Sequence, residues 1–275
     1  MLELSRPDGA QIHFEVTGDD GPAVVLASYW SWNPSVYEEL VSDLASDHRV
    51  LTYHLRGTGD SSRNGPYEME VDVGDLEEVV EAAAGPVVMI ATADSSNRSV
   101  KLAARRPELV TAVITFGTAP IARAAFEGKE GMLASDTVVD AFVEMLGRSY
   151  RGGMRTLMEA TNPQMSADQL RERVAAQVEF CHLEPAVGRL RVWVEDDPRE
   201  DARALGDRLW IFAAAGVAGP WMPPSEELAR LTREALPDAN VVQIDPGPIS
   251  APHETAEAIR RVTAALRAGA AEERK

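Results

Sequence analysis

Three ionisable side chains are the candidates for chemistry in this sequence. Asp94 follows the apolar run 87–90 and precedes a stretch of small residues and strong helix formers. A carboxylate at a helix N-terminus can act as a nucleophile or as a general acid or base. It can also cap the helix and pair with Arg98, four residues on. His182 and His253 could assist it as bases, and a water-facing position in the last helix is the alternative for His253.

The elements that must hold these residues alternate between strands and helices. Short apolar runs predict strands covered on both faces, and amphipathic stretches predict helices between them, as in a parallel sheet with helices on both sides. Between residues 119 and 206 no strand-like run occurs, and apolar stripes predict helices alone. The expected strands are 1–5, 11–17, 23–27, 49–53, 87–90, 110–116, 209–213 and 241–244, and the expected helices outside 119–206 are 35–44, 72–84, 97–105, 225–236 and 254–266.

This order of elements resembles the α/β-hydrolase fold with an inserted helical lid. Two local sequences carry the resemblance as well. Residues 55–61, LRGTGDS, resemble the R-G-x-G-x-S turn after the fourth strand, and residues 103–110, AARRPELV, resemble the exit from the helix behind the nucleophile. The resemblance implies an α/β fold class, a mostly parallel sheet flanked by helices. It places the core in 1–118 and 207–268, the lid in 119–206 and a frayed tail in 269–275.

In that family a serine in a G-x-S-x-G turn attacks the substrate, helped by an acid after the seventh strand and a histidine after the eighth. Counting back from Pro107 puts Ala93 at the serine position. A slip of one residue would present Asp94 instead, which resembles the dehalogenase and epoxide-hydrolase branches. No carboxylate occurs in residues 214–224, and Pro248 stands where the histidine is usual. Serine-dependent hydrolysis is therefore not expected.

The loop that follows the third strand reads Ser-Tyr-Trp-Ser-Trp-Asn over residues 28–33, where the family usually carries H-G. Its aromatic rings offer large apolar surfaces with polar tips. We expect them to border a pocket for a small, mainly apolar molecule, with packing in the core as the alternative. The predicted lining consists of Ser28, Tyr29, Trp30, Trp32, Ala93, Ser95, Asn162, Gln164, Met165 and Trp221.

The serine, acid, histidine and H-G positions of the family are all substituted in this sequence. This favours a site with a different chemistry. The favoured hypothesis is an enzyme of the lyase, isomerase or cyclase type, in which Asp94 is the acid or base and backbone amides give electrostatic support. One alternative is a hydrolase with Asp94 as nucleophile and His253 or His182 activating water. The other is a small-molecule binding protein without turnover.

The composition argues against several partners and compartments. A net charge of −17 disfavours nucleic acid and anionic membranes, and no apolar run approaches the length of about 18 residues that a membrane span needs. The single cysteine, Cys181, and the lack of a signal-peptide pattern favour the cytoplasm. Because no His or Cys pair has metal-ligand spacing, we expect no metal and no cofactor. We expect a monomer or a homodimer.

Overall fold

Eight strands form one mixed sheet in the computed structural model, which describes residues 2–121, 123–127, 135–162, 164–214, 224–244 and 251–272. Their order across the sheet is β1-β2-β4-β3-β5-β6-β7-β8. The pairings β1–β2 and β2–β4 are antiparallel, and all others are parallel. The strands are β1 (Leu2–Ser5), β2 (Gln11–Thr17), β3 (Ala23–Leu26), β4 (Arg49–Tyr53), β5 (Val87–Ala91), β6 (Val110–Phe116), β7 (Leu209–Ala214) and β8 (Asn240–Ile244).

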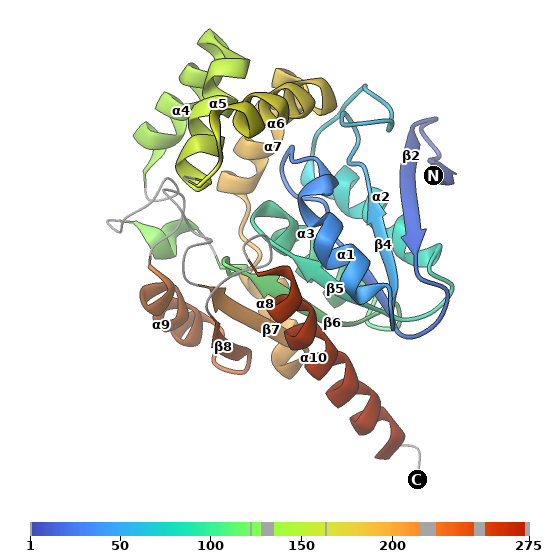
Figure 1. Cartoon of the computed structure of the whole chain (residues 1–275). Helices are drawn as coiled ribbons and strands as arrows, with labels where there is room; N and C mark the ends of the chain where they lie inside the picture. The colour runs from blue at the N-terminus through green and yellow to red at the C-terminus, as the bar shows by residue number, and fades with distance from the viewer. Residues whose placement is uncertain are drawn as a thin grey trace.

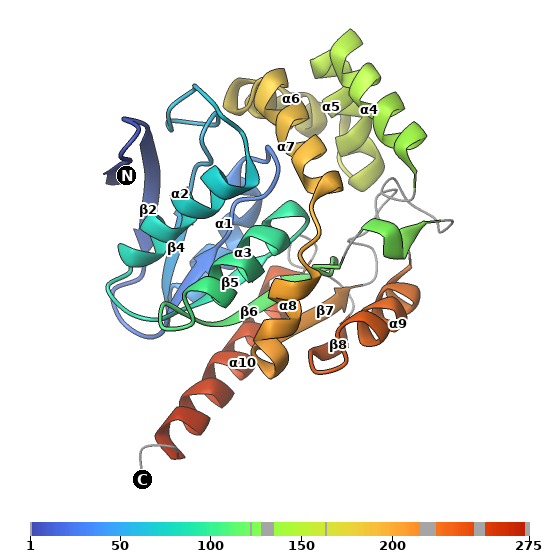
Figure 2. The ribbon, with the colours of Figure 1, turned by 180° about the vertical axis from the view of Figure 1, so that it is seen from behind.

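Helices cover both faces of this sheet. Helices α1 and α10 pack against each other on one face (Figure 1), and α2, α3 and α8 lie on the other (Figure 2). The predicted arrangement of a mostly parallel sheet between two helical layers is thereby confirmed. The helices around the sheet are α1 (Glu38–Leu44), α2 (Met69–Glu81), α3 (Asp94–Arg105), α8 (Arg199–Leu205), α9 (Ser225–Ala235) and α10 (Pro252–Glu272).

A helical insertion lies between β6 and β7 and gathers at the top of the molecule in Figure 1. It contains α4 (Asp136–Arg148), α5 (Tyr150–Thr161), α6 (Ala167–Phe180) and α7 (Leu183–Glu195). Ser166 caps α6 by accepting the N–H of the third helical residue. Within the described part of this region the regular elements are helical, which agrees with the missing strand pattern.

Helix α3 differs from its predicted bounds at the end that matters for function. It begins at Asp94 rather than at Asn97, directly after the N-cap residue Ala93. The sequence between these positions, Ser95 and Ser96, favours caps and turns because serine hydroxyls bond to nearby backbone. Here Ser95 does so within the first helical turn, where its hydroxyl donates to the carbonyl of Thr92. The chain therefore passes from strand β5 into helix with almost no connecting loop.

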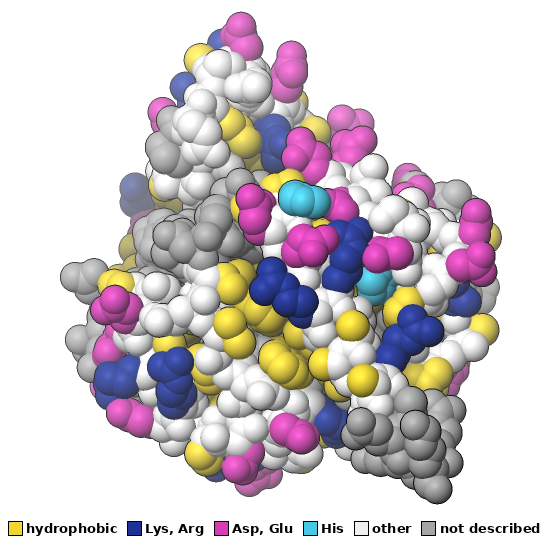
Figure 3. Space-filling view, turned by 60° about the horizontal axis from the view of Figure 1, so that its bottom comes forward, with side chains coloured by type: hydrophobic (Ala, Val, Ile, Leu, Met, Phe, Trp, Pro, Cys, Tyr) yellow, Lys and Arg dark blue, Asp and Glu magenta, His cyan; other side chains and the backbone are white. Residues whose placement is uncertain are grey.

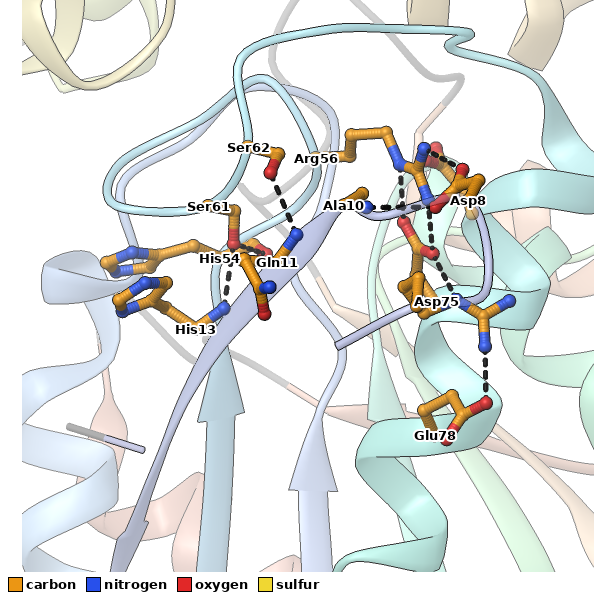
Figure 4. A network of polar contacts seen from close by, with 12 residues as sticks. Asp8, Ala10, Gln11, His13, His54, Arg56, Ser61, Ser62, Asp75 and Glu78 are labelled. Atoms are coloured by element: carbon orange, nitrogen blue, oxygen red, sulfur yellow. Dashed lines mark hydrogen bonds and ion pairs between the residues drawn. The ribbon is translucent and has the colours of Figure 1, made fainter. Parts of the chain in front are cut away.

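The turn after β4 contacts β2 and α2, as Figure 4 shows, and it also contacts the insertion. Arg56 is buried and donates two hydrogen bonds to Asp75 of α2, from Nε to Oδ2 at 3.0 Å and from Nη2 to Oδ1 at 2.9 Å. The hydroxyl of Ser61 accepts a backbone N–H of β2 at 3.0 Å. On the other side, the Gly59 N–H donates to the carbonyl of Phe180 at the end of α6, at 2.7 Å. This turn holds one end of the insertion onto the core.

Acidic side chains are numerous on the face of the molecule that Figure 3 draws. On the face in Figure 3 they lie scattered and interspersed with lysine and arginine side chains. Across the described ranges, no helix combines the length and the apolar character that crossing a bilayer requires. On the face in Figure 3 the negative charge is therefore not gathered into one local patch.

Candidate functional site

The strand-to-helix turn between β5 and α3 has a strained tip. Ala93 has φ 48° and ψ −134°, a backbone conformation that L-residues other than glycine rarely adopt and that costs about 1–3 kcal/mol. Every other residue from Val87 to Ala103 is buried, whereas Ala93 is partly exposed. Of the two residues that the sequence left as candidates for the tip, Ala93 occupies it. Its methyl group carries no nucleophile.

Hydroxyl groups around the tip hold this strained geometry. The Ala93 N–H donates to Thr118 Oγ1 at 3.0 Å, and Ser96 Oγ lies 3.0 Å from the same oxygen. The Thr92 N–H donates to Ser95 Oγ at 2.9 Å. Because strain persists only where the surroundings over-determine it, the turn is a built feature and not a loose connection.

The Asp94 side chain points away from solvent, and both of its oxygens accept hydrogen bonds. Its exposed fraction is 1%. Oδ2 accepts from Arg98 Nη1 at 2.6 Å, which confirms the pairing predicted from the i,i+4 spacing. Oδ1 accepts from the backbone N–H of Trp30 at 2.5 Å. Burial raises the pKa of Asp94, and the Arg98 guanidinium and the Trp30 N–H oppose that rise.

Asp94 belongs to a ring of buried polar contacts that joins the turn to the insertion. Arg189 of α7 binds Asp72 of α2 through Nε–Oδ2 at 2.8 Å and Nη2–Oδ1 at 2.9 Å. Asp72 Oδ2 lies 3.5 Å from Arg98 Nη1. The indole N–H of Trp30 then returns to α7 by donating to the carbonyl of Ala186 at 2.7 Å. Two buried arginines thus balance two buried aspartates, as buried charges require.

The aromatic loop after β3 packs largely against itself and against the insertion. Trp30 is 5% exposed and has a positive φ of 42°. Its ring centroid lies 6.4 Å from that of Trp32 and 6.1 Å from that of Phe142 in α4. Tyr29 stacks on Trp32 at 6.2 Å and lies 5.9 Å from Tyr37. Such offset and edge contacts stabilise aromatic clusters, so much of the expected pocket lining is buried in ring contacts.

Other predicted lining residues have the following places. Ser28 is buried, its hydroxyl donates to the carbonyl of Tyr53, and its own carbonyl accepts from Arg98 Nη2 at 2.6 Å. In the insertion, Asn162 ends α5 and donates to the Met158 carbonyl at 3.1 Å. Gln164 is exposed and Met165 is partly buried. Trp221 lies outside the described residues.

The two candidate histidines lie on different elements from the turn. His253 is exposed near the start of α10, where its Nδ1 pairs with Asp43 Oδ2 of α1 at 2.6 Å. That hydrogen bond raises the pKa of His253. His182 is exposed at the N-terminus of α7. Among the contacts of the described residues, none joins either imidazole to Ala93 or Asp94. Residues 215–223 and 245–250, the expected acid and histidine positions, lie outside the described ranges.

Sequence reasoning missed Asp72, Arg189 and Gln177, which hold the aromatic loop and the insertion together. Gln177 of α6 accepts from the Asn33 N–H at 3.1 Å and donates to the carbonyl of Ser31. The sequence held one signal for Asp72 and Arg189. Each interrupts an apolar helical stripe, and because a charge on a core-facing stripe is rarely buried unless it is paired, both could have been expected to have a buried partner.

Comparisons with known proteins establish the fold of this chain but not its activity. No family model matches the chain. The sequence is 26% identical over 126 residues to proline iminopeptidase PfmaB from Pestalotiopsis fici, and the match spans 44% of this chain and 45% of that protein.

Solved structures match almost the whole chain. An esterase from Exiguobacterium antarcticum matches with a TM-score of 0.79 and 16% identity, covering 96% of this chain and 98% of that one. A bromoperoxidase from Bacillus anthracis gives 0.75 and 18%, covering 94% and 95%. The enol-lactonase from Burkholderia xenovorans LB400 gives 0.68 and 22%, covering 97% and 100%. With the eight-stranded sheet, these likenesses show that the chain has the α/β-hydrolase fold.

Proposed function

We propose that this protein binds a small, mainly apolar molecule over the Ala93 turn and does not cleave it through a nucleophile on that turn. The observation that carries the proposal is the tip itself. A strained residue that is partly exposed while the rest of 87–103 is buried marks a candidate functional position, and here it presents a methyl group. Methyl and aromatic surfaces with a few fixed polar groups suit an apolar ligand.

The surroundings of Asp94 support binding over nucleophilic attack. A carboxylate that attacks a substrate needs an accessible oxygen, whereas both oxygens of Asp94 are hydrogen-bonded and the side chain is buried. The five histidines of the chain all lie within the described residues. His253 is engaged by Asp43 on the face of the sheet that α1 and α10 cover. Within the part of the chain that the structure describes, neither His253 nor His182 contacts Asp94, which supports binding over hydrolysis.

The proposal predicts that Nile red, an uncharged dye that brightens in apolar surroundings, binds the protein and that Ala93→Leu weakens binding at least tenfold. The larger side chain would extend from the turn tip into the proposed binding position, and a factor of ten corresponds to about 1.4 kcal/mol. Ala84→Leu is the matched control, because Ala84 is exposed, lies beyond α2 and also has a positive φ, 55° against 48°. Fluorescence titration with folded variants measures both. Equal affinity of Ala93→Leu and wild type would place the dye elsewhere and contradict the proposal.

A hydrolysis assay tests the second half of the proposal. We expect no turnover of p-nitrophenyl butyrate above background and no labelling by a fluorophosphonate probe, because the hydroxyl groups nearest to the turn are buried and already hydrogen-bonded. Ser95 is fully buried and donates to the Thr92 carbonyl at 2.6 Å. Mass spectrometry of the probed protein would locate any label. A labelled serine in α3 would show that a nucleophile is present after all.

One observation favours a second candidate function, acid or base catalysis by Asp94 of the lyase or isomerase type. Burial raises the pKa of Asp94, and a carboxylate with a raised pKa is suited to exchanging protons near neutral pH. Under this alternative, Asp94→Asn would lower turnover by about 10²–10⁴-fold. A small-molecule extract incubated with wild type and with Asp94→Asn, then compared by mass spectrometry, separates the candidates. Binding without chemistry predicts that neither protein consumes any compound.

A further inference from the structure

The backbone N–H of Trp30 is a hydrogen-bond donor next to the turn. Whether a ligand can use this donor depends on which acceptor it already binds. In this fold, an N–H from the loop after the third strand and the N–H of the residue after the turn tip together stabilise an anionic oxygen. Trp30 lies in that loop, and Asp94 is the residue after the tip. The Trp30 N–H points to Asp94 Oδ1 at 2.5 Å. A carboxylate of the chain itself already occupies this donor.

The neighbouring contacts hold that carboxylate in place. Arg98 Nη1 binds Asp94 Oδ2 at 2.6 Å, and Arg98 Nη2 binds the Ser28 carbonyl at 2.6 Å, two residues before Trp30. The loop is therefore fixed to α3 by two hydrogen bonds. The Trp30 N–H donates to Asp94, and the Ser28 carbonyl accepts from Arg98. Because the Asp94 and Arg98 charges balance, the pair adds no net positive charge that could attract a second anion. The chain as a whole carries a net charge of −17.

We propose that Asp94 acts as a built-in anion, so that the site over Ala93 selects uncharged molecules and excludes carboxylates. This inference rests on the proposed binding function. An anionic head group placed over the turn would find the Trp30 N–H already bound to Asp94, so that with one of the two donors taken the loss of its hydration would be compensated only in part. An alcohol or another uncharged group loses far less hydration on entry.

A matched pair of probes tests this selectivity. 1-Decanol and decanoate have the same chain length and differ in the charge of the head group. Displacement of Nile red at pH 8, below the micelle concentration of decanoate, should require at least tenfold more decanoate than decanol, as expected when a charged group finds no partner. Equal potency of the two probes on the wild type would overturn the inference.

Two variants identify Asp94 as the cause. In Asp94→Ala/Arg98→Met both members of the ion pair become uncharged, which buried pairs often tolerate, and the Trp30 N–H is released. The gap between decanol and decanoate should then shrink to less than about threefold, since the freed N–H can bind the carboxylate. In Asp94→Asn/Arg98→Met, which is equally uncharged at both positions, the Asn side-chain oxygen can still accept from the Trp30 N–H, so a gap of at least tenfold should remain.

The outcomes separate the inference from the binding function on which it rests. An unchanged gap in Asp94→Ala/Arg98→Met, or a lost gap in Asp94→Asn/Arg98→Met, would overturn the role of Asp94 while Nile red binding stands. If either double variant does not fold, the comparison of decanol with decanoate on the wild type still decides whether the site excludes carboxylates. Nile red binding that is absent, or that is insensitive to Ala93→Leu, would instead overturn the binding function.

Discussion

Replacing Asp72 by alanine should lower the free energy of unfolding by about 3–5 kcal/mol, the usual cost of removing one partner of a buried ion pair. Asp72 is buried between Arg189, at 2.8 and 2.9 Å, and Arg98, at 3.5 Å. Without it, Arg189 loses its carboxylate partner, and Arg98 keeps Asp94 alone. Urea denaturation at pH 7 measures the effect. Glu70→Ala is the control, because Glu70 lies in the same helix but pairs with Arg105 in the solvent, where a pair contributes about 0–1 kcal/mol.

The pH dependence of this loss has a definite sign. Burial raises the pKa of Asp72, but the guanidinium groups of Arg189 and Arg98 outweigh it and hold the pKa below its ordinary value of 3.8. A depressed pKa stabilises the folded state above the ordinary value, and that contribution disappears as the pH falls through the folded-state pKa. The difference between wild type and Asp72→Ala should therefore shrink below pH 3.8. A loss under about 1 kcal/mol at pH 7 would contradict the ring of charges.

Trp30→Ala should cost about 3–5 kcal/mol, because a large buried ring is removed and a cavity is left behind, and it should weaken Nile red binding, because the aromatic loop loses its contacts with α4 and α7. The substitution also leaves the Ala186 carbonyl without the indole donor. Trp193, partly buried in α7, provides the control, and its replacement by alanine should cost less and leave dye binding intact. Denaturation and fluorescence titration check both effects. Dye binding that is unchanged in folded Trp30→Ala would show that the aromatic loop does not border the site.

The fold could be predicted from the sequence because each strand and helix carries its own local pattern. An apolar run predicts the strand Val87–Ala91, small residues predict the turn, and strong helix formers predict the helix that ends at Arg105. Helical spacing alone predicts the pair Asp94–Arg98, because both residues lie on one helix. These local rules also placed the turn tip within one residue.

The polar ring could not be predicted, because its partners are far apart in the chain. Asp72 and Arg189 are separated by 117 positions, and Trp30 and Asp94 by 64. No local pattern tells which buried charge meets which. The positive φ of Trp30 was equally hidden, because tryptophan gives no signal for a conformation that usually calls for glycine. The hydrogen bond from Trp30 to Asp94, on which the proposal of binding over catalysis depends, is therefore a tertiary contact that no local pattern predicts.

The most direct test of the account is a crystal structure of the protein grown with 1-decanol. The account predicts density for the alcohol in contact with the Ala93 methyl group, with the Trp30 N–H still donating to Asp94. Density in the open cleft of about 480 Å³ that His13, Thr17 and Glu38 line between β2 and α1, with none over Ala93, would contradict it.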